Sequence, residues 1–67
     1  YLPGDVLPIR IIQDGKEADQ GVGYMEDGTM VVVEGGKEYM DRTINVYVTR
    51  FINREAGRMF FAVPDKK

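Results

Sequence analysis

Three arginines recur at intervals of four residues near the end of the sequence, and their chemistry suits an anionic polymer. Arg50, Arg54 and Arg58 bracket a predicted hairpin, so residues 50 and 58 are expected near its base and Arg54 at its tip. Guanidinium groups bind phosphate oxygens, and aromatic rings beside them can stack on nucleic-acid bases. Tyr47 and Phe60 stand next to this hairpin. The pattern therefore predicts phosphate and base contacts on one hairpin.

Further cations fall in predicted loops and could lengthen this track. These cations are Lys16, Lys37 and Arg42. They would extend the positively charged track of the hairpin arginines if their loops lie on the same edge of a barrel as the hairpin. Tyr24, on a predicted strand, is the preferred stacking residue for a base. A tyrosine opposite Val31 fits a core position with its hydroxyl at the rim equally well, so both interpretations stay open.

Acidic side chains offer a second interpretation of the same charges. The arginines of the hairpin could pair with Glu55 or Asp41, and exposed pairs of this kind contribute only ~0–1 kcal/mol to stability. The hairpin would then be a solvated surface feature.

A metal site built from Glu26, Asp27 and Glu34 is conceivable, but an acid followed by glycine is ordinary turn chemistry. No metal site is therefore expected.

The composition excludes most kinds of catalytic site. The 67 residues contain no cysteine and no histidine, so disulfides, thiolate or imidazole zinc sites and the usual general base are missing. We expect no catalytic residue and no cofactor.

The formal charge of −2 argues against strong attraction to phosphate over the whole surface, so binding of nucleic acid should be weak and local. No apolar stretch approaches the ~20 residues of a membrane helix, and no membrane contact by this segment is expected.

Runs of β-branched and aromatic residues between turn signals predict an all-β fold. Five strands in so short a chain close most economically as a small OB-like barrel, and an SH3-like barrel is the nearest competitor. Pro8 should lie at an edge or a bulge, because proline donates no ladder hydrogen bond. The predicted strands span about residues 6–13, 21–26, 29–34, 44–49 and 58–63.

The step Asp27-Gly28 favours a two-residue type I′ turn between the second and third strands. That register gives two apolar sides, with Val22, Tyr24, Val31 and Val33 on one and Met25, Met30 and Val32 on the other. A closed barrel would use both sides. Gly21 and Gly23 are expected to allow a bulge or a close approach of backbones, as glycines within strands usually do. They are not expected to form a phosphate-binding loop, because the sequence around them lacks the following glycine, the Gly-Lys-Ser or Gly-Lys-Thr ending and the helix of such a loop.

The next strand shows the clearest alternation of apolar and polar residues. Its break at Phe51-Ile52 predicts a bulge or a turn around the end of the barrel, and residues 53–57 form a loop of hairpin length. The core side of this strand is predicted to carry Ile44, Val46 and Val48.

Several of these segments, taken in order, resemble the TRAM domain. The segments are Gly21–Tyr24, Asp27–Val33, Ile44–Thr49 and Ala56–Ala62, and the likeness runs from about Asp5 to Val63. It is most similar to the version at the C-terminus of bacterial proteins that carry a PIN nuclease-like domain and, in some, a membrane anchor. One departure is Met40-Asp41-Arg42, where many members have Pro-Gly-Glu. Asp41 tolerates a left-handed backbone, which would preserve the turn.

The resemblance implies a five-stranded OB-like module that binds RNA and is attached to an RNA-processing enzyme. Residues 1–67 are then expected to be a single domain with a core of about 5–63, excerpted from a longer cytoplasmic or membrane-anchored chain. The predicted function is a non-catalytic RNA-binding accessory module that holds substrate for a PIN-type nuclease domain and binds weakly alone. The alternative is a protein-interaction or oligomerisation barrel that packs against its parent domain. Independent enzymatic activity is not expected.

Overall fold

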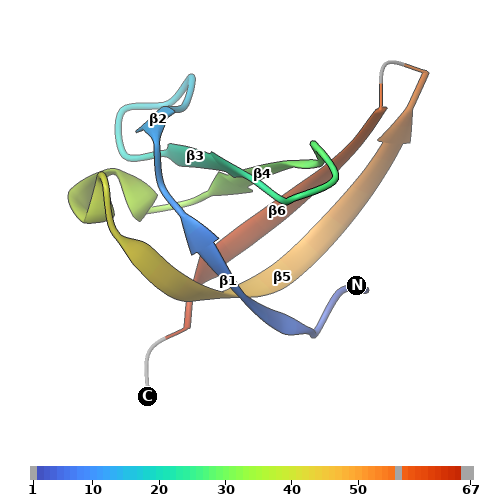
Figure 1. Ribbon diagram of the computed structural model, residues 1–67, viewed down its shortest axis with the longest axis horizontal. Coiled ribbons are helices and arrows are strands. Elements are labelled where there is room, and N and C mark those ends of the chain that lie inside the picture. The colour runs from blue at the N-terminus through green and yellow to red at the C-terminus, as the bar shows by residue number, and fades with distance from the viewer. Residues whose placement is uncertain (1, 56, 66–67) are drawn as a thin grey trace.

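Six strands and one short 3₁₀ helix form the part of the chain that the computed structural model describes, residues 2–55 and 57–65. They join in a single curled sheet with the order β1-β5-β6-β4-β3-β2 (Figure 1). This is a small OB-like β-barrel, as predicted. The elements are β1 (Val6–Arg10), β2 (Gln13–Asp14), β3 (Gly21–Tyr24), β4 (Met30–Val33), η1 (Gly36–Tyr39), β5 (Thr43–Arg54) and β6 (Gly57–Pro64).

One stretch of chain supplies both edges of the sheet, because β1 and β2 are separated only by Ile11 and Ile12. The Ile11 N–H donates a hydrogen bond to the Arg42 carbonyl at 3.0 Å, beside β5. The next N–H, of Ile12, donates to the Val22 carbonyl of β3 at 2.9 Å. The predicted strand 6–13 is therefore divided where it changes partner. Pro8 lies in β1, an edge strand of the sheet order, as expected for a residue without an N–H.

Close approach of β3 to the end of β1 requires glycine. A Cβ atom at Gly23 would lie 2.3 Å from the Arg10 carbonyl oxygen and 2.8 Å from a side-chain carbon of Ile9. Such distances are incompatible with van der Waals radii. The sequence-based prediction for the glycines of this strand is confirmed at this position, where the absence of a side chain lets the sheet curl onto itself.

The core lies on the concave side of the sheet. The parallel ladder of β4 with β6 places Val31 beside Phe60 and Val33 beside Ala62. The predicted core side of the fourth strand is confirmed for Val46 and Val48, which are fully buried. Ile44 is half-buried and packs against the same cluster. The buried cluster consists of Leu7, Ile9, Ile11, Val31, Val33, Val46, Val48, Phe60 and Ala62.

The β3–β4 connection differs from the predicted two-residue turn. The Gly28 N–H donates to the Met25 carbonyl, and the Met25 N–H donates to the Thr29 carbonyl, both at 2.9 Å. Three residues therefore form the loop, and of these only Gly28 has a left-handed φ, of 90°. Asp27 does not have a positive φ, and its carboxylate accepts a hydrogen bond from the Thr29 N–H at 2.9 Å. This is the common type I turn followed by a bulge.

The longer loop shifts the predicted register by one residue, which moves the side chains of one strand to the other face. Tyr24 lies opposite Met30 instead of Val31, and Val31 lies opposite Gly23. The predicted grouping of side chains in this hairpin was therefore wrong. Val31 and Val33 face the core with the glycines of β3, whereas the outer face carries Val22, Tyr24, Met30 and Val32.

The contribution of the β3–β4 loop to stability depends on pH through Asp27. Hydrogen bonds from Thr29, first from its side chain and then from its backbone N–H, lower the pKa of Asp27 below its ordinary value of 3.8. The charge of Arg58 adds a smaller effect in the same direction. Because the folded-state pKa is depressed, the carboxylate stabilises the fold above pH 3.8, and this contribution is lost as the pH falls through the folded-state pKa.

We expect the variant Asp27→Asn to flatten the loss of stability in acid. An asparagine keeps an oxygen that can accept the Thr29 hydrogen bond but has no proton to gain between pH 5 and pH 2. The melting temperature of the variant and of the parent chain should be measured by circular dichroism across that range. Parallel curves for the two proteins would contradict the role assigned to this carboxylate.

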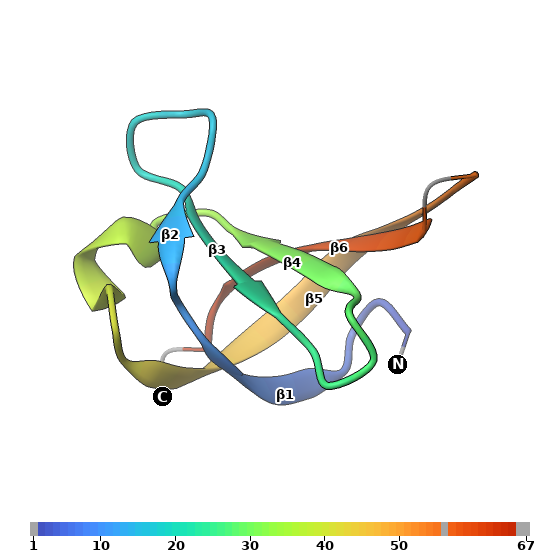
Figure 2. The same ribbon diagram turned by 45° about the horizontal axis from the view of Figure 1, so that its top comes forward.

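The β5–β6 hairpin is longer and tighter than predicted. β5 continues through Phe51 and Ile52, so the bulge or turn predicted at these two residues was wrong; the bulge lies between Val48 and Arg50, at Thr49. β5 ends at Arg54, which pairs with Gly57, so the predicted loop over residues 53–57 was wrong; Ala56 lies outside the described residues. Figure 2 shows this hairpin and the β2–β3 loop projecting from the body, with β3 and β4 between them.

Candidate nucleic-acid interface

The outer face of the sheet carries two rows of mostly apolar side chains that run across the strands. Partners in each row follow from the pairing registers, and alternation along each strand puts them on the same face. The first row is Arg50, Phe61, Val32 and Val22, and the second is Ile52, Met59, Met30 and Tyr24. The rows give the sheet an outward-facing apolar strip with arginine at one end and tyrosine at the other.

A groove of about 500 Å³ lies over this strip. We call it the outer groove. Its floor comes from β3, β4 and β6, one wall comes from β2 and the β2–β3 loop, and Arg54 closes it on the hairpin side. The lining residues are Gln13, Asp14, Gly15, Lys16, Glu17, Gln20, Val22, Met30, Val32, Arg54, Met59 and Phe61.

Charges of both signs line the outer groove. Lys16 projects from the β2–β3 loop and Arg54 from the end of β5, so one cation stands on each side of the apolar floor. Asp14 and Glu17 share the wall with Lys16. A polyanion lying across the floor would meet a cation at each side, but the two acids weaken its net attraction.

Local hydrogen bonds hold the β2–β3 loop beside the groove. The Gly15 N–H donates to the Gln20 carbonyl at 2.8 Å, and the Gln20 side-chain amide donates to the Glu34 carboxylate at the end of β4. The Lys37 N–H of η1 donates to the Asp19 carbonyl at 3.1 Å. These bonds fix the base of the loop on two neighbouring elements and thereby set the position of its lysine.

An arginine and an aromatic ring pack together at the β5 end of the strip. The guanidinium carbon of Arg50 lies 4.6 Å from the centroid of the Phe61 ring, within the range of a cation–π interaction. The bulge at Thr49 re-aims this part of β5, and the Thr49 hydroxyl donates a hydrogen bond to the Phe61 carbonyl at 3.0 Å. Two neighbouring residues of β5 therefore hold Phe61: Arg50 contacts its ring, and Thr49 contacts its backbone.

The seven residues predicted to bind nucleic acid fall into two groups. Lys16 and Arg54 line the outer groove, and Arg50 and Tyr24 lie in the rows beneath it. Tyr24 is 42% exposed, so it is not a core residue. The other three cations lie elsewhere: Lys37 in η1, Arg42 just before β5, and Arg58 on the side of the hairpin opposite Arg54.

Two expectations for the hairpin were wrong. Arg50 pairs with Phe61, whereas Arg58 pairs with Asn53 near the tip, so these arginines do not meet at the base of the hairpin. Phe60 is only 4% exposed and packs in the core against Phe51, with ring centroids 5.2 Å apart, so it cannot stack on a ligand. The first error comes from the predicted five-residue loop, which placed the strands in the wrong register.

Sequence reasoning passed over Phe61 as a site residue. The signal was present in β6, because strict alternation puts Met59 and Phe61 on the side opposite Phe60. Since Phe60 is a core residue, its two neighbours must face outward. Phe61 is the aromatic residue among the described residues that line the outer groove.

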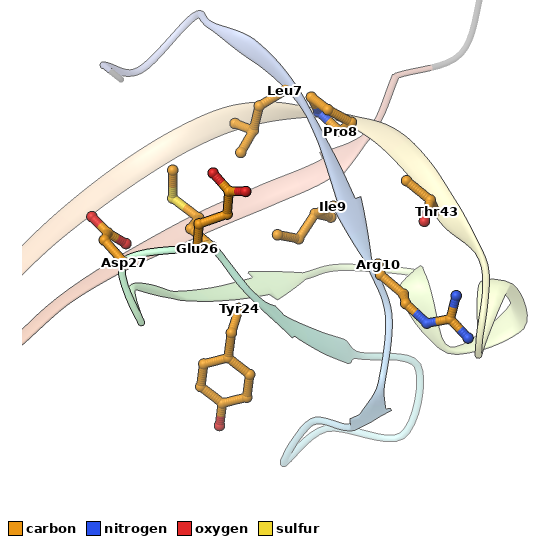
Figure 3. Close-up of a pocket in the computed structure, with 9 residues that line it drawn as sticks. Leu7, Pro8, Ile9, Arg10, Tyr24, Glu26, Asp27 and Thr43 are labelled. Carbon is orange, nitrogen blue, oxygen red and sulfur yellow. The ribbon is translucent and has the colours of Figure 1, made fainter.

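A larger cavity of about 780 Å³ lies between β1 and the β3–β4 loop (Figure 3). Leu7 and Ile9 point toward its centre, and Glu26 and Asp27 stand at its rim, while the Tyr24 ring points away from these leucine and isoleucine side chains. Among the described residues, two carboxylates and one cation, Arg10, line this cavity, whereas two carboxylates and two cations line the outer groove, so this cavity disfavours a polyanion more strongly. The outer groove is therefore the better candidate for nucleic acid.

Two features are absent from the described residues. No cluster of three or more aspartate, glutamate, cysteine or histidine side chains there could hold a metal ion. None of the helical segments described is long and apolar enough to cross a membrane.

The fold and groove define an OB-like barrel with an apolar surface that is flanked by charges of both signs between the β2–β3 loop and the β5–β6 hairpin. A family model described as the TRAM domain matches residues 2–54, and the chain belongs to this family, which confirms the resemblance seen in the sequence. No solved structure matches the chain.

Three relatives show the proteins in which this domain occurs. An uncharacterized PIN and TRAM-domain containing protein of Synechocystis is 59% identical over 64 residues, which cover 96% of this chain and 18% of the relative. The uncharacterized PIN and TRAM-domain containing protein YacL of Bacillus subtilis is 51% identical over 63 residues, with coverage of 94% and 17%. An uncharacterized protein, ycf81, of Mesostigma viride is 39% identical over 66 residues, with coverage of 98% and 17%. The chain thus spans about a sixth of the length of these relatives.

Proposed function

We propose that this domain is a non-catalytic RNA-binding module that holds substrate for a PIN-type nuclease domain of the same parent chain. The observation that carries the proposal is the outer groove, in which an apolar floor with an outward-facing aromatic ring lies between Lys16 and Arg54. Cations on both sides suit a phosphate backbone, and the floor suits bases. The names of the relatives, which pair PIN with TRAM, support the attached domain.

Binding by the isolated domain is expected to be weak and sensitive to salt. The chain has a net charge of −2, and two carboxylates share the groove with its two cations. Each phosphate contact that a cation makes releases counterions, so the logarithm of affinity falls with the logarithm of salt concentration. An accessory module of this kind gains from attachment to its enzyme, since tethering raises the effective concentration of a weakly held substrate.

A second candidate function is protein interaction through a different surface. Leu2, Val6 and Tyr47 are exposed large apolar side chains, and Val6 pairs directly with Tyr47 across β1 and β5. The apolar residues on both sides of the β3–β4 hairpin also favour this alternative at the level of sequence. Their support is weakened because Val32 is buried and Met25 and Met30 are half-buried within the chain. Sedimentation velocity that detects only monomer at high concentration would exclude self-association.

Removal of both groove cations is the test of the RNA-binding proposal. The double variant Lys16→Gln/Arg54→Gln should bind fluorescein-labelled RNA more weakly at 20 mM salt and show a salt slope smaller by about 1.4, since each phosphate contact to a single strand contributes about 0.7. Fluorescence anisotropy with an unstructured RNA of 20 nucleotides and with an RNA hairpin measures both quantities.

The matched control is Lys37→Gln/Arg42→Gln, which removes the same two charges away from the groove. We expect it to weaken binding much less and to leave the salt slope near that of the parent chain. Equal effects of the two double variants would show that only overall charge matters. No binding of either RNA below millimolar concentration would overturn the proposed function itself.

A further inference from the structure

The environment of Phe61 suggests a specific use for its ring. The side chain is half-buried, lies in the middle of the outer face and lines the outer groove. Val32, its partner on β4, is buried in the strip beside it. Phe61 thus brings to the groove an apolar aromatic side chain that is already partly removed from water, the residue type on which nucleic-acid bases stack.

Arg50 contacts the same ring but does not line the groove. Its guanidinium carbon lies over the ring at 4.6 Å from the centroid, so one ring face is occupied by a cation. The Thr49 hydroxyl also donates to the Phe61 carbonyl, which holds the backbone of β6 at this residue. The contact with Arg50 restricts the ring before any ligand arrives, so less entropy is lost in ordering the ring when a base stacks on it.

We propose that the outer groove accepts unpaired nucleotides, with one base stacked on the groove-facing surface of Phe61, and that Arg50 is a positioning residue that holds the ring. This inference rests on the proposed function and names its substrate class. A stacking platform needs a base with a free face, and in a duplex both faces of each internal base are covered by neighbouring pairs. Single-stranded RNA meets that condition, and stacking on an aromatic ring tolerates any base.

Phe61→Leu tests the platform, because leucine keeps an apolar side chain but removes the planar ring. The variant should bind a labelled uridine 12-mer about 5- to 150-fold more weakly than the parent chain, the range expected for loss of one stacked base. Phe61→Tyr keeps the ring and should bind close to normally. Circular dichroism melts of both variants establish that they fold.

Nuclear magnetic resonance gives a readout that a merely structural role would not produce. Stacking places the uracil H5 and H6 protons over the ring, so some of these signals should shift upfield in the complex. They should shift with Phe61→Tyr and not with Phe61→Leu. A blunt duplex of 12 base pairs is expected to bind more weakly than the single strand at the same salt concentration.

Arg50→Gln and Arg54→Gln separate positioning from phosphate binding. Because Arg50 is engaged with the ring, its loss should lower affinity while leaving the salt slope unchanged. Loss of Arg54, which lines the groove, should reduce the slope by about 0.7. Arg50→Lys should restore part of the affinity, since an ammonium group also interacts with a ring face.

The outcomes keep the two proposals distinct. If no RNA binds the parent chain, the proposed function fails. If RNA binds but Phe61→Leu binds equally well, or the duplex binds as tightly as the single strand, the stacking inference fails and the proposed function stands. If Arg50→Gln reduces the salt slope as much as Arg54→Gln, Arg50 contacts phosphate and its positioning role is overturned.

Discussion

Substitution of Gly23 by alanine should destabilise the domain by about 3 kcal/mol, the upper end of the usual cost of overpacking. The added methyl group would meet the Arg10 carbonyl oxygen at 2.3 Å, and this atom belongs to the backbone of β1 and cannot rotate away. Either β3 or β1 must move, which separates the two elements whose approach curls the sheet. Urea unfolding followed by circular dichroism measures the loss.

Gly28→Ala is the matched control for this glycine. Gly28 has a left-handed φ of 90°, but no atom lies within 4 Å of a Cβ placed there. Its replacement should therefore cost only the backbone strain of about 1–2 kcal/mol. If Gly23→Ala is no more damaging than Gly28→Ala, the close contact between β3 and β1 is not a requirement of the fold.

Phe60→Ala should leave little or no folded protein at 37 °C. Truncation of a buried phenylalanine costs about 3–5 kcal/mol, and a domain of this size has a total stability of only about 3–10 kcal/mol. The ring is 4% exposed, pairs with Val31 across the parallel ladder and packs against Phe51. Differential scanning calorimetry should detect a melting temperature lowered by roughly 15 °C or more, or no transition.

The adjacent residue supplies the comparison for Phe60. Phe61→Ala also removes a phenyl ring, but from the outer face, where the side chain is only half-buried. This variant should keep a cooperative unfolding transition. RNA affinity per folded molecule, measured at a temperature where part of the Phe60 variant is still folded, should respond in the opposite order, because the folded fraction of the Phe60 variant keeps its groove and the Phe61 variant does not. Equal stability losses in the two variants would contradict the assignment of Phe60 to the core and Phe61 to the groove.

Alternation and turn chemistry were enough to predict the barrel, and the reasons for the errors are local. The core side of β5 could be predicted because Val46 and Val48 alternate with polar residues, which needs no knowledge of the partner strands. The β3–β4 register could not, because Asp27-Gly28 fits both a two-residue and a three-residue loop. A side-chain hydrogen bond to Thr29 selects the longer one, and apolar residues on both faces of the hairpin left no pattern to decide it.

The candidate site was predicted in part for a similar reason. Lys16 and Arg54 could be nominated from residue type, but only the sheet order shows that their segments stand on either side of one groove. Lys37, Arg42 and Arg58 have the same chemistry and lie elsewhere, and nothing in their sequence neighbourhood distinguishes them. The role of all seven nominated residues in RNA binding stays a prediction.

The sheet order also bears on how this domain can be shortened. β6 lies between β5 and β4, although it is the last strand in the sequence and begins after the segment that the family model matches. A fragment ending at Arg54 would leave two strands with bare hydrogen-bonding edges and would expose the valines of β4. Unprotected edges of this kind recruit strands from other molecules, so such a fragment would tend to aggregate.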